Sequence, residues 1–173
     1  MPSNEIKTLT QTPAPVSEAA RVDDILRRLS HEDAKLGALL LKAAVAGAVV
    51  ARQPSDTMLR AEAAEAWNSM SQVIAHHLAS EEEVIIPWAK LREDFPRDLI
   101  VRAREQHCRL RCLTDTIDRT SFITGSDTDV AVAGGALTAL AVFLDDVIDS
   151  EERDLFPMLQ RSLFAEGSVA PHA

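Results

Sequence analysis

Residues 77–87 read His-Leu-Ala-Ser-Glu-Glu-Glu-Val-Ile-Ile-Pro, and a related segment returns at residues 147–157 as Val-Ile-Asp-Ser-Glu-Glu-Arg-Asp-Leu-Phe-Pro. When the two copies are aligned on Ser-Glu-Glu and the proline, Glu81 corresponds to Glu151, whereas the histidine of the first copy corresponds to Val147. A histidine and a glutamate four positions apart on a helix share one face, and such a pair can hold a metal ion. One copy has the whole pair, and the other keeps only the carboxylate.

The composition favours a single helical domain. The chain has 173 residues, only 4% of them aromatic, with no tyrosine. This length is sufficient for a buried core, and the dominance of Leu, Ala, Val and Ile suits close-packed helices. The net charge of -9 disfavours a nucleic-acid surface or an anionic membrane surface, because both require a basic patch.

The two ends of the chain are predicted to be flexible tails, at residues 1–20 and 166–173, around one folded domain at residues 21–165. The N-terminal segment is polar and lacks the apolar core of a signal peptide. The longest apolar stretch, residues 38–51, is too short to span a bilayer and contains Lys42. We therefore expect a cytoplasmic protein without a membrane span.

Turn signals divide the predicted domain into four long helices. Ser55 is the expected N-cap of the second helix, Pro87 is expected to end it, and Ser30 marks a break in the first. The predicted helices span residues 22–51, 56–86, 96–120 and 128–163. Four long helices with short connections predict an all-α, up-down-up-down four-helix bundle.

Helical periodicity identifies the positions that face the interior. These positions are Trp67, Met70, Ile74, His77, Glu81, Val84 and Trp88 on the second helix, Ile100, Ala103, His107, Leu110 and Ile117 on the third, and Leu140, Leu144, Val147, Glu151, Leu155 and Met158 on the fourth. Polar side chains thus interrupt three apolar stripes. These interrupting residues are His77, Glu81, His107 and Glu151. His31 on the first helix is a fifth candidate for an inward polar side chain, and its face otherwise carries small residues.

The interruptions indicate a metal site when they are taken together. An ionised glutamate in a helical core costs several kcal/mol unless it is paired or bound to a metal. A single inward histidine or glutamate is usually structural, but here imidazoles and carboxylates converge from several helices. No inward lysine or arginine is predicted to neutralise them. Helix bundles build di-iron sites from this combination of groups.

The same residues resemble the hemerythrin-like family with its His-His-Glu signature. The resemblance rests on His31 in the first helix, His77-x-x-x-Glu81 in the second, His107 in the third and Glu151 in the fourth. It implies a four-helix bundle around a non-haem di-iron centre. By this resemblance Glu81 and Glu151 bridge the two irons, His31 and His77 bind one iron, and His107 binds the other.

The last histidine of the family pattern falls at Val147, and three interpretations follow. The site could be di-iron with an additional open position, which favours reactivity over reversible carriage. It could hold a single metal ion, bound by the ligands of the first two helices with or without Glu151. Alternatively, Asp146 could substitute for the histidine if a π-bulge turned it inward. We favour an altered or substituted di-iron site.

The predicted function is an iron protein that binds, reduces or senses O₂, NO or peroxide, for example in a stress response, and the pattern leaves open whether it is an enzyme. One alternative is iron storage or delivery, or a sensor without turnover. Another is a degenerate bundle that holds a single metal, a different cofactor such as haem, or none.

Two further features have simpler interpretations. The acidic residues Glu82, Glu83 and Glu152 are expected to form a solvated face. The small residues at 43–47 and 132–136 are expected to allow close approach of two helices, rather than to form a tunnel for a small gas.

Overall fold

The computed structural model describes residues 17–167, apart from the side chains of residues 32–35, 166 and 167. Every regular element in this part of the chain is helical, which confirms the all-α fold. The elements are α1 (Glu18–Arg52), α2 (Thr57–Ser80), the π-helix η1 (Glu81–Ile85), α3 (Ile86–Lys90), α4 (Arg97–Asp118), α5 (Asp127–Ser150), the π-helix η2 (Glu151–Leu155) and α6 (Phe156–Gly167). The predicted tails fall mostly outside the described residues.

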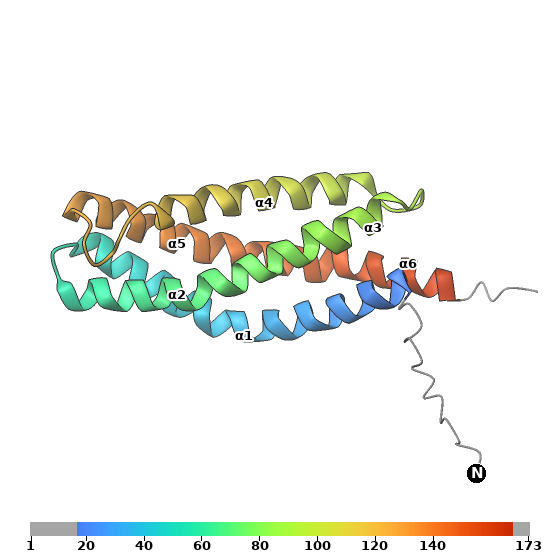
Figure 1. Cartoon of the computed structure of the whole chain (residues 1–173), viewed down its shortest axis with the longest axis horizontal. Coiled ribbons are helices and arrows are strands. Elements are labelled where there is room, and N and C mark those ends of the chain that lie inside the picture. The colour runs from blue at the N-terminus through green and yellow to red at the C-terminus, as the bar shows by residue number, and fades with distance from the viewer. Residues whose placement is uncertain (1–16, 168–173) are drawn as a thin grey trace, which may run out of the picture.

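The long helices lie side by side along the long axis of the molecule (Figure 1). Helix α1 packs against both α2 and α5, and α4 packs against α5. Helices α2, η1 and α3 follow one another without a break, as do α5, η2 and α6. The apolar faces of these helices meet in the interior, where they surround the polar residues described below.

Side-chain caps set the start of several helices. Asp56, and not the predicted Ser55, caps α2, because its Oδ1 accepts hydrogen bonds from the N–H groups of Met58 and Leu59 at 2.8 and 3.2 Å. The prediction was wrong by one residue. Ser and Asp have similar capping ability, so the sequence pattern alone did not separate these neighbours.

Helix α1 begins earlier than predicted and does not break at Ser30. Its N-cap is Ser17, which accepts a hydrogen bond from the N–H of Ala20 at 3.2 Å. Instead of a break, the helix axis turns by 50° between the segments Glu18–His31 and Leu36–Arg52. The capping pattern at Ser30 therefore marks the start of a bend inside a continuous helix.

Both copies of the duplicated segment widen into a π-helix just before their proline. In η1 and η2 the N–H of the residue preceding Pro87 or Pro157 donates to the carbonyl of Glu81 or Glu151, five positions back. A proline ring crowds the carbonyl four residues before it, and a wider turn relieves that contact. The second helix therefore continues through α3, and the predicted end near residue 86 was wrong.

The predicted inward positions are buried, with one exception. Met158 is half-buried, and Leu159 takes the fully buried position instead. Met158 and Leu159 lie three and four residues after the buried Leu155, and both spacings fit the helical period, so the sequence pattern did not separate them.

Helices α1 and α5 approach each other closely at Gly47 and Gly134. A Cβ atom added to Gly47 would lie 2.6 Å from the carbonyl oxygen of Gly134, and one added to Gly134 would lie 2.7 Å from that of Gly47. The prediction of close approach is confirmed for this pair. Gly135 does not take part, because a Cβ there would meet nothing within 4 Å.

The stretch Asp127–Ala165 is long and apolar enough to cross a membrane by length and composition alone. The two halves of α1 meet the same criterion only when they are taken together across their bend. The core helix of a soluble protein passes this test as well, and α5 supplies nine buried residues to the core. Packing inside the bundle accounts for part of this apolar character, because 44% of the apolar window is buried.

Arg60 is a buried cation that joins two loops at one end of the molecule. Its Nε donates to the carbonyl of Pro54 at 2.5 Å, while its Nη1 and Nη2 donate to the Gly125 carbonyl at 2.8 Å and to Asp127 Oδ1 at 2.5 Å. We expect Arg60→Met to lower the free energy of unfolding by about 2 kcal/mol, because two carbonyl groups lose their donor. Urea denaturation measures this loss.

The matched control for Arg60 is Arg119, whose side chain is 80% exposed and lies 3.9 Å from Asp115. Arg119→Met should change the free energy of unfolding by less than about 0.5 kcal/mol, since exposed ion pairs contribute little. Equal losses in the two variants would contradict a structural role for Arg60.

Candidate metal site

The two copies of the duplicated segment meet at one point inside the bundle. His77, Glu81 and Glu151 each offer a ligand atom within 4.8 Å of the others. His77 Nε2 lies 3.2 Å from Glu151 Oε2 and 3.8 Å from Glu81 Oε1. At most 2% of any of these three side chains is exposed. The group is therefore shielded from bulk water.

His107 adds a second imidazole to this group. Its Nε2 lies 2.7 Å from Glu81 Oε2, and the residue is 2% exposed. Glu81 thus lies between the two histidines, with Oε1 toward His77 and Oε2 toward His107. The structure brings four of the predicted ligands together as two imidazoles and two carboxylates.

Helix geometry places each of these side chains. His77 lies in the last turn of α2 and shares a face with Glu81, the first residue of η1. Glu151 is the first residue of η2, and His107 lies in the middle of α4. Both carboxylates therefore come from the first position of a π-helix, a local irregularity that is frequent at functional sites.

The two glutamates have buried oxygen atoms that no protein group satisfies. Among the described residues, Glu81 Oε1 and Glu151 Oε1 are buried and have no hydrogen-bond partner. Arg60 is the one buried lysine or arginine in the described part of the chain, and it is bound to the loops. Buried carboxylates without a cationic side chain fit a metal ion, for which imidazole and carboxylate are common ligands.

Burial and mutual repulsion act on the protonation of the site. Burial, followed by the negative charge of Glu81, raises the pKa of Glu151 to about 7. Burial lowers the pKa of His107, but its hydrogen bond to Glu81 and the charges of Glu81, Glu151 and Glu82 outweigh this effect and raise it. A bound cation would reverse both shifts, because ligation requires the ionised carboxylate and the neutral imidazole.

Metal affinity should therefore rise with pH until Glu151 and His107 have both lost their protons. Below the raised pKa of Glu151, a cation must displace at least one proton, so the affinity should fall about tenfold for each pH unit. Competition with a chelator of known affinity, repeated across this range, measures the slope. An affinity that does not change between about pH 6 and 7 would contradict this assignment of Glu151.

Stability of the metal-free protein should depend on pH in the opposite sense. The pKa of Glu151 is raised from 4.5 to about 7, so the folded state binds more protons than the unfolded state between these values. The stabilising contribution of Glu151 to the free energy of unfolding is therefore fully present below about pH 4.5 and is lost as the pH rises through about 7.

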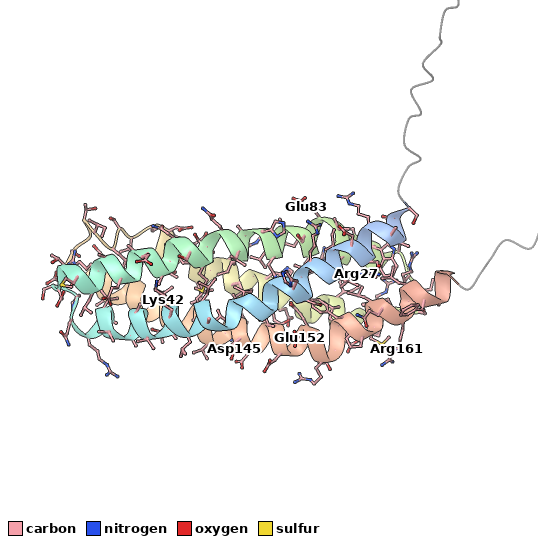
Figure 2. The ribbon with its side chains drawn as sticks, turned by 90° about the horizontal axis from the view of Figure 1, so that it is seen from below. Arg27, Lys42, Glu83, Asp145, Glu152 and Arg161 are labelled. Carbon is pink, nitrogen blue, oxygen red and sulfur yellow. The ribbon has the colours of Figure 1, made fainter. Side chains whose placement is uncertain are left out.

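Glu82 is not part of a simple solvated acidic face, so that prediction was wrong for this residue. Its Oε1 lies 3.1 Å from His107 Nδ1, and its Oε2 accepts a hydrogen bond from Arg111 Nη2. His107 and Arg111 are four residues apart on α4, and this spacing was the available signal for a partner carboxylate. Glu83 and Glu152 are exposed on the outer surface, as predicted (Figure 2).

Two predicted ligands lie apart from the buried group. His31, on α1, and Asp146, on α5, both have exposed side chains. The π-turn of η2 begins five residues after Asp146, so it does not turn that carboxylate inward. Val147 is fully buried at the position of the missing histidine. A role for His31 in ligation remains a prediction.

The sequence was compared with models of known protein families. The model of the hemerythrin HHE cation-binding domain matches residues 24–159, which cover most of the chain and include all four buried donors. The chain belongs to the hemerythrin HHE family. Comparison with curated proteins gave no match, and comparison with solved structures gave none either. Membership in this cation-binding family and the buried His/Glu cluster agree on a metal site.

Proposed function

We propose that this hemerythrin-family chain is a cytoplasmic protein that binds non-haem iron between the helices of an up-down-up-down four-helix bundle. Its ligands are His77, Glu81, His107 and Glu151. The observation that carries the proposal is the pair of buried carboxylates, each with one oxygen that lacks a protein partner. Two negative charges and two imidazoles suit an iron cation in both charge and ligand type.

We infer an altered di-iron centre, because Glu81 lies between two histidines and could hold one cation with each of its oxygens. Its two oxygens face different histidines, at 3.8 Å from His77 and 2.7 Å from His107. With Val147 in place of a histidine, the protein supplies fewer ligands than the family pattern. The shortfall leaves coordination positions open for a small ligand.

Bound iron would supply the capacity to bind or reduce O₂, NO or peroxide. The residues of the chain set the conditions for that chemistry. Glu81 and Glu151 offset the charge of the cations, and the imidazoles bind in their neutral form. Burial of all four ligands excludes bulk water, which strengthens electrostatic interactions within the site.

The direct test is to load the purified protein with Fe²⁺ without oxygen and to measure iron per chain. Two ions per chain support the altered di-iron centre, one ion supports a mononuclear site, and none contradicts the proposal. An absorption spectrum of the protein as purified tests the haem alternative, since haem has an intense and characteristic band. The same sample, exposed to peroxide or NO, shows whether the protein turns over its ligand repeatedly or reacts once, as a sensor or store would.

The open position can be tested by restoring the histidine. Val147→His should increase iron affinity, because it adds an imidazole next to Glu151. It should also slow the reaction with NO, because it fills a free coordination position. Val142→His is the control, since Val142 lies on the same helix but is 56% exposed. Identical affinity and reactivity in both variants would show that position 147 does not face the metal.

A further inference from the structure

We propose that Glu82 is a positioning residue that orients His107 for metal binding and that Arg111 holds Glu82 in place. This inference rests on the proposed metal site and adds two residues that do not themselves contact the metal. It starts from the observation that both ring nitrogens of His107 lie against carboxylates, Nε2 at 2.7 Å from Glu81 and Nδ1 at 3.1 Å from Glu82.

The two nitrogens of His107 have different tasks. Nε2 faces the buried group and is therefore the ligand atom. A nitrogen that binds a metal carries no proton, so in the neutral ring the proton lies on Nδ1. Nδ1–H then donates to Glu82 Oε1, and this hydrogen bond selects the tautomer that ligation requires. A carboxylate in this position also increases the basicity of the ligating nitrogen.

The fold explains why Glu82 reaches His107 from outside the site. Glu82 follows Glu81 directly in η1, so its side chain leaves the helix in a different direction from that of Glu81. Glu81 therefore points into the core, while Glu82 points toward α4. There His107 and Arg111 share one face, and each engages a different oxygen of the Glu82 carboxylate.

Arg111 restricts the freedom of Glu82. Because one oxygen is bound to Arg111, the carboxylate cannot turn away from His107 without losing that contact. The Glu82–Arg111 pair is not itself an important source of stability, since the two side chains are 32% and 56% exposed. Its effect is to fix the orientation of a buried imidazole.

The second copy of the duplicated segment has no such arrangement. The counterpart of Glu82 is Glu152, whose side chain is exposed. Support through Glu82 therefore acts on one side of the site, at His107. If it matters for binding, removal of Glu82 should weaken metal binding without unfolding the protein.

The test compares Glu82→Leu, Glu82→Gln and the control Glu83→Leu, which removes an exposed neighbouring charge. Zn²⁺ affinity is measured by chelator competition, and urea denaturation of the metal-free proteins checks folding. Glu82→Leu should weaken Zn²⁺ binding about 10- to 100-fold. Glu82→Gln should retain part of the affinity, because its amide oxygen still accepts from Nδ1–H. Glu83→Leu should bind like the unmodified protein.

A second readout detects the orientation directly. In the Zn²⁺-loaded protein, the NMR signal of the His107 Nδ1–H should be slow to exchange with water. This proton should exchange with water faster in Glu82→Leu, and its exchange rate in Arg111→Met should lie between those of Glu82→Leu and the unmodified protein. A loss of folding stability alone would not produce this ordered change.

The outcomes separate this inference from the proposed metal site. If the unmodified protein binds neither Zn²⁺ nor Fe²⁺, the metal site itself is wrong. If it binds metal and Glu82→Leu binds equally well, the site stands and the role of Glu82 is overturned. Equal losses in Glu82→Leu and Glu83→Leu would also overturn that role, because they would show a general effect of surface charge.

Discussion

Replacing Glu151 by glutamine is expected to weaken iron binding at least about 100-fold and to stabilise the metal-free protein. The loss of affinity follows because the variant keeps the size of the side chain but loses the charge and the better ligand oxygen. The gain in stability follows because burial and the nearby Glu81 raise the pKa of Glu151 to about 7. Ionised Glu151 thus opposes folding above that pH, by about 3 kcal/mol.

The adjacent Glu152 provides a matched control for this variant. Glu152 is exposed, so Glu152→Gln should leave both iron affinity and the free energy of unfolding almost unchanged. Chelator competition measures the first quantity and urea denaturation of metal-free protein the second. The stabilisation by Glu151→Gln should be clear near pH 8 and should decline as the pH falls, becoming small near about pH 4, where Glu151 is protonated in both the folded and the unfolded state. Undiminished iron binding by Glu151→Gln would exclude Glu151 from the metal site.

Replacing Gly134 by alanine is expected to lower the free energy of unfolding by about 3 kcal/mol. The added Cβ would lie 2.7 Å from the carbonyl oxygen of Gly47, 2.7 Å from Val50 Cγ1 and 3.0 Å from the nitrogen of Ala51. Two of these three contacts are backbone atoms, which cannot move aside as a flexible side chain can. Helices α1 and α5 would therefore have to separate along a contact that lies in the core.

Gly135 provides the matched control for this variant. A Cβ at Gly135 meets nothing within 4 Å, so Gly135→Ala should stabilise the helix by about 0.5–1 kcal/mol, the usual gain over glycine. Urea denaturation of both variants gives the comparison. A similar change in the two variants would contradict the close approach of the helices at Gly134.

The periodicity of the sequence was sufficient to identify the buried donors. His77, Glu81, His107 and Glu151 interrupt apolar stripes, and the structure places all four in the interior. The reason is that the helical period depends on local backbone geometry, so the face on which a residue lies can be counted along the chain. The family resemblance rested on these residues together with His31, and membership in the family was confirmed.

Local irregularities of the helices were less predictable. The sequence indicated helix ends at Pro87 and a break at Ser30, whereas the structure has a π-turn before the proline and a bend in α1. Whether a helix stops or widens at a proline depends on the packing of the residues beyond it. In this protein the residues after Pro87 continue into the core, where Trp88 is fully buried.

By itself, the sequence determined the helical fold, the inward faces and the set of metal-ligand candidates, since each follows from spacing along one helix. The tertiary structure decided which residues of different helices meet. It paired Gly47 with Gly134 and not with Gly135, and it set Glu82 against His107. Such contacts depend on the rotation and offset of one helix against another, which no spacing within a single helix encodes.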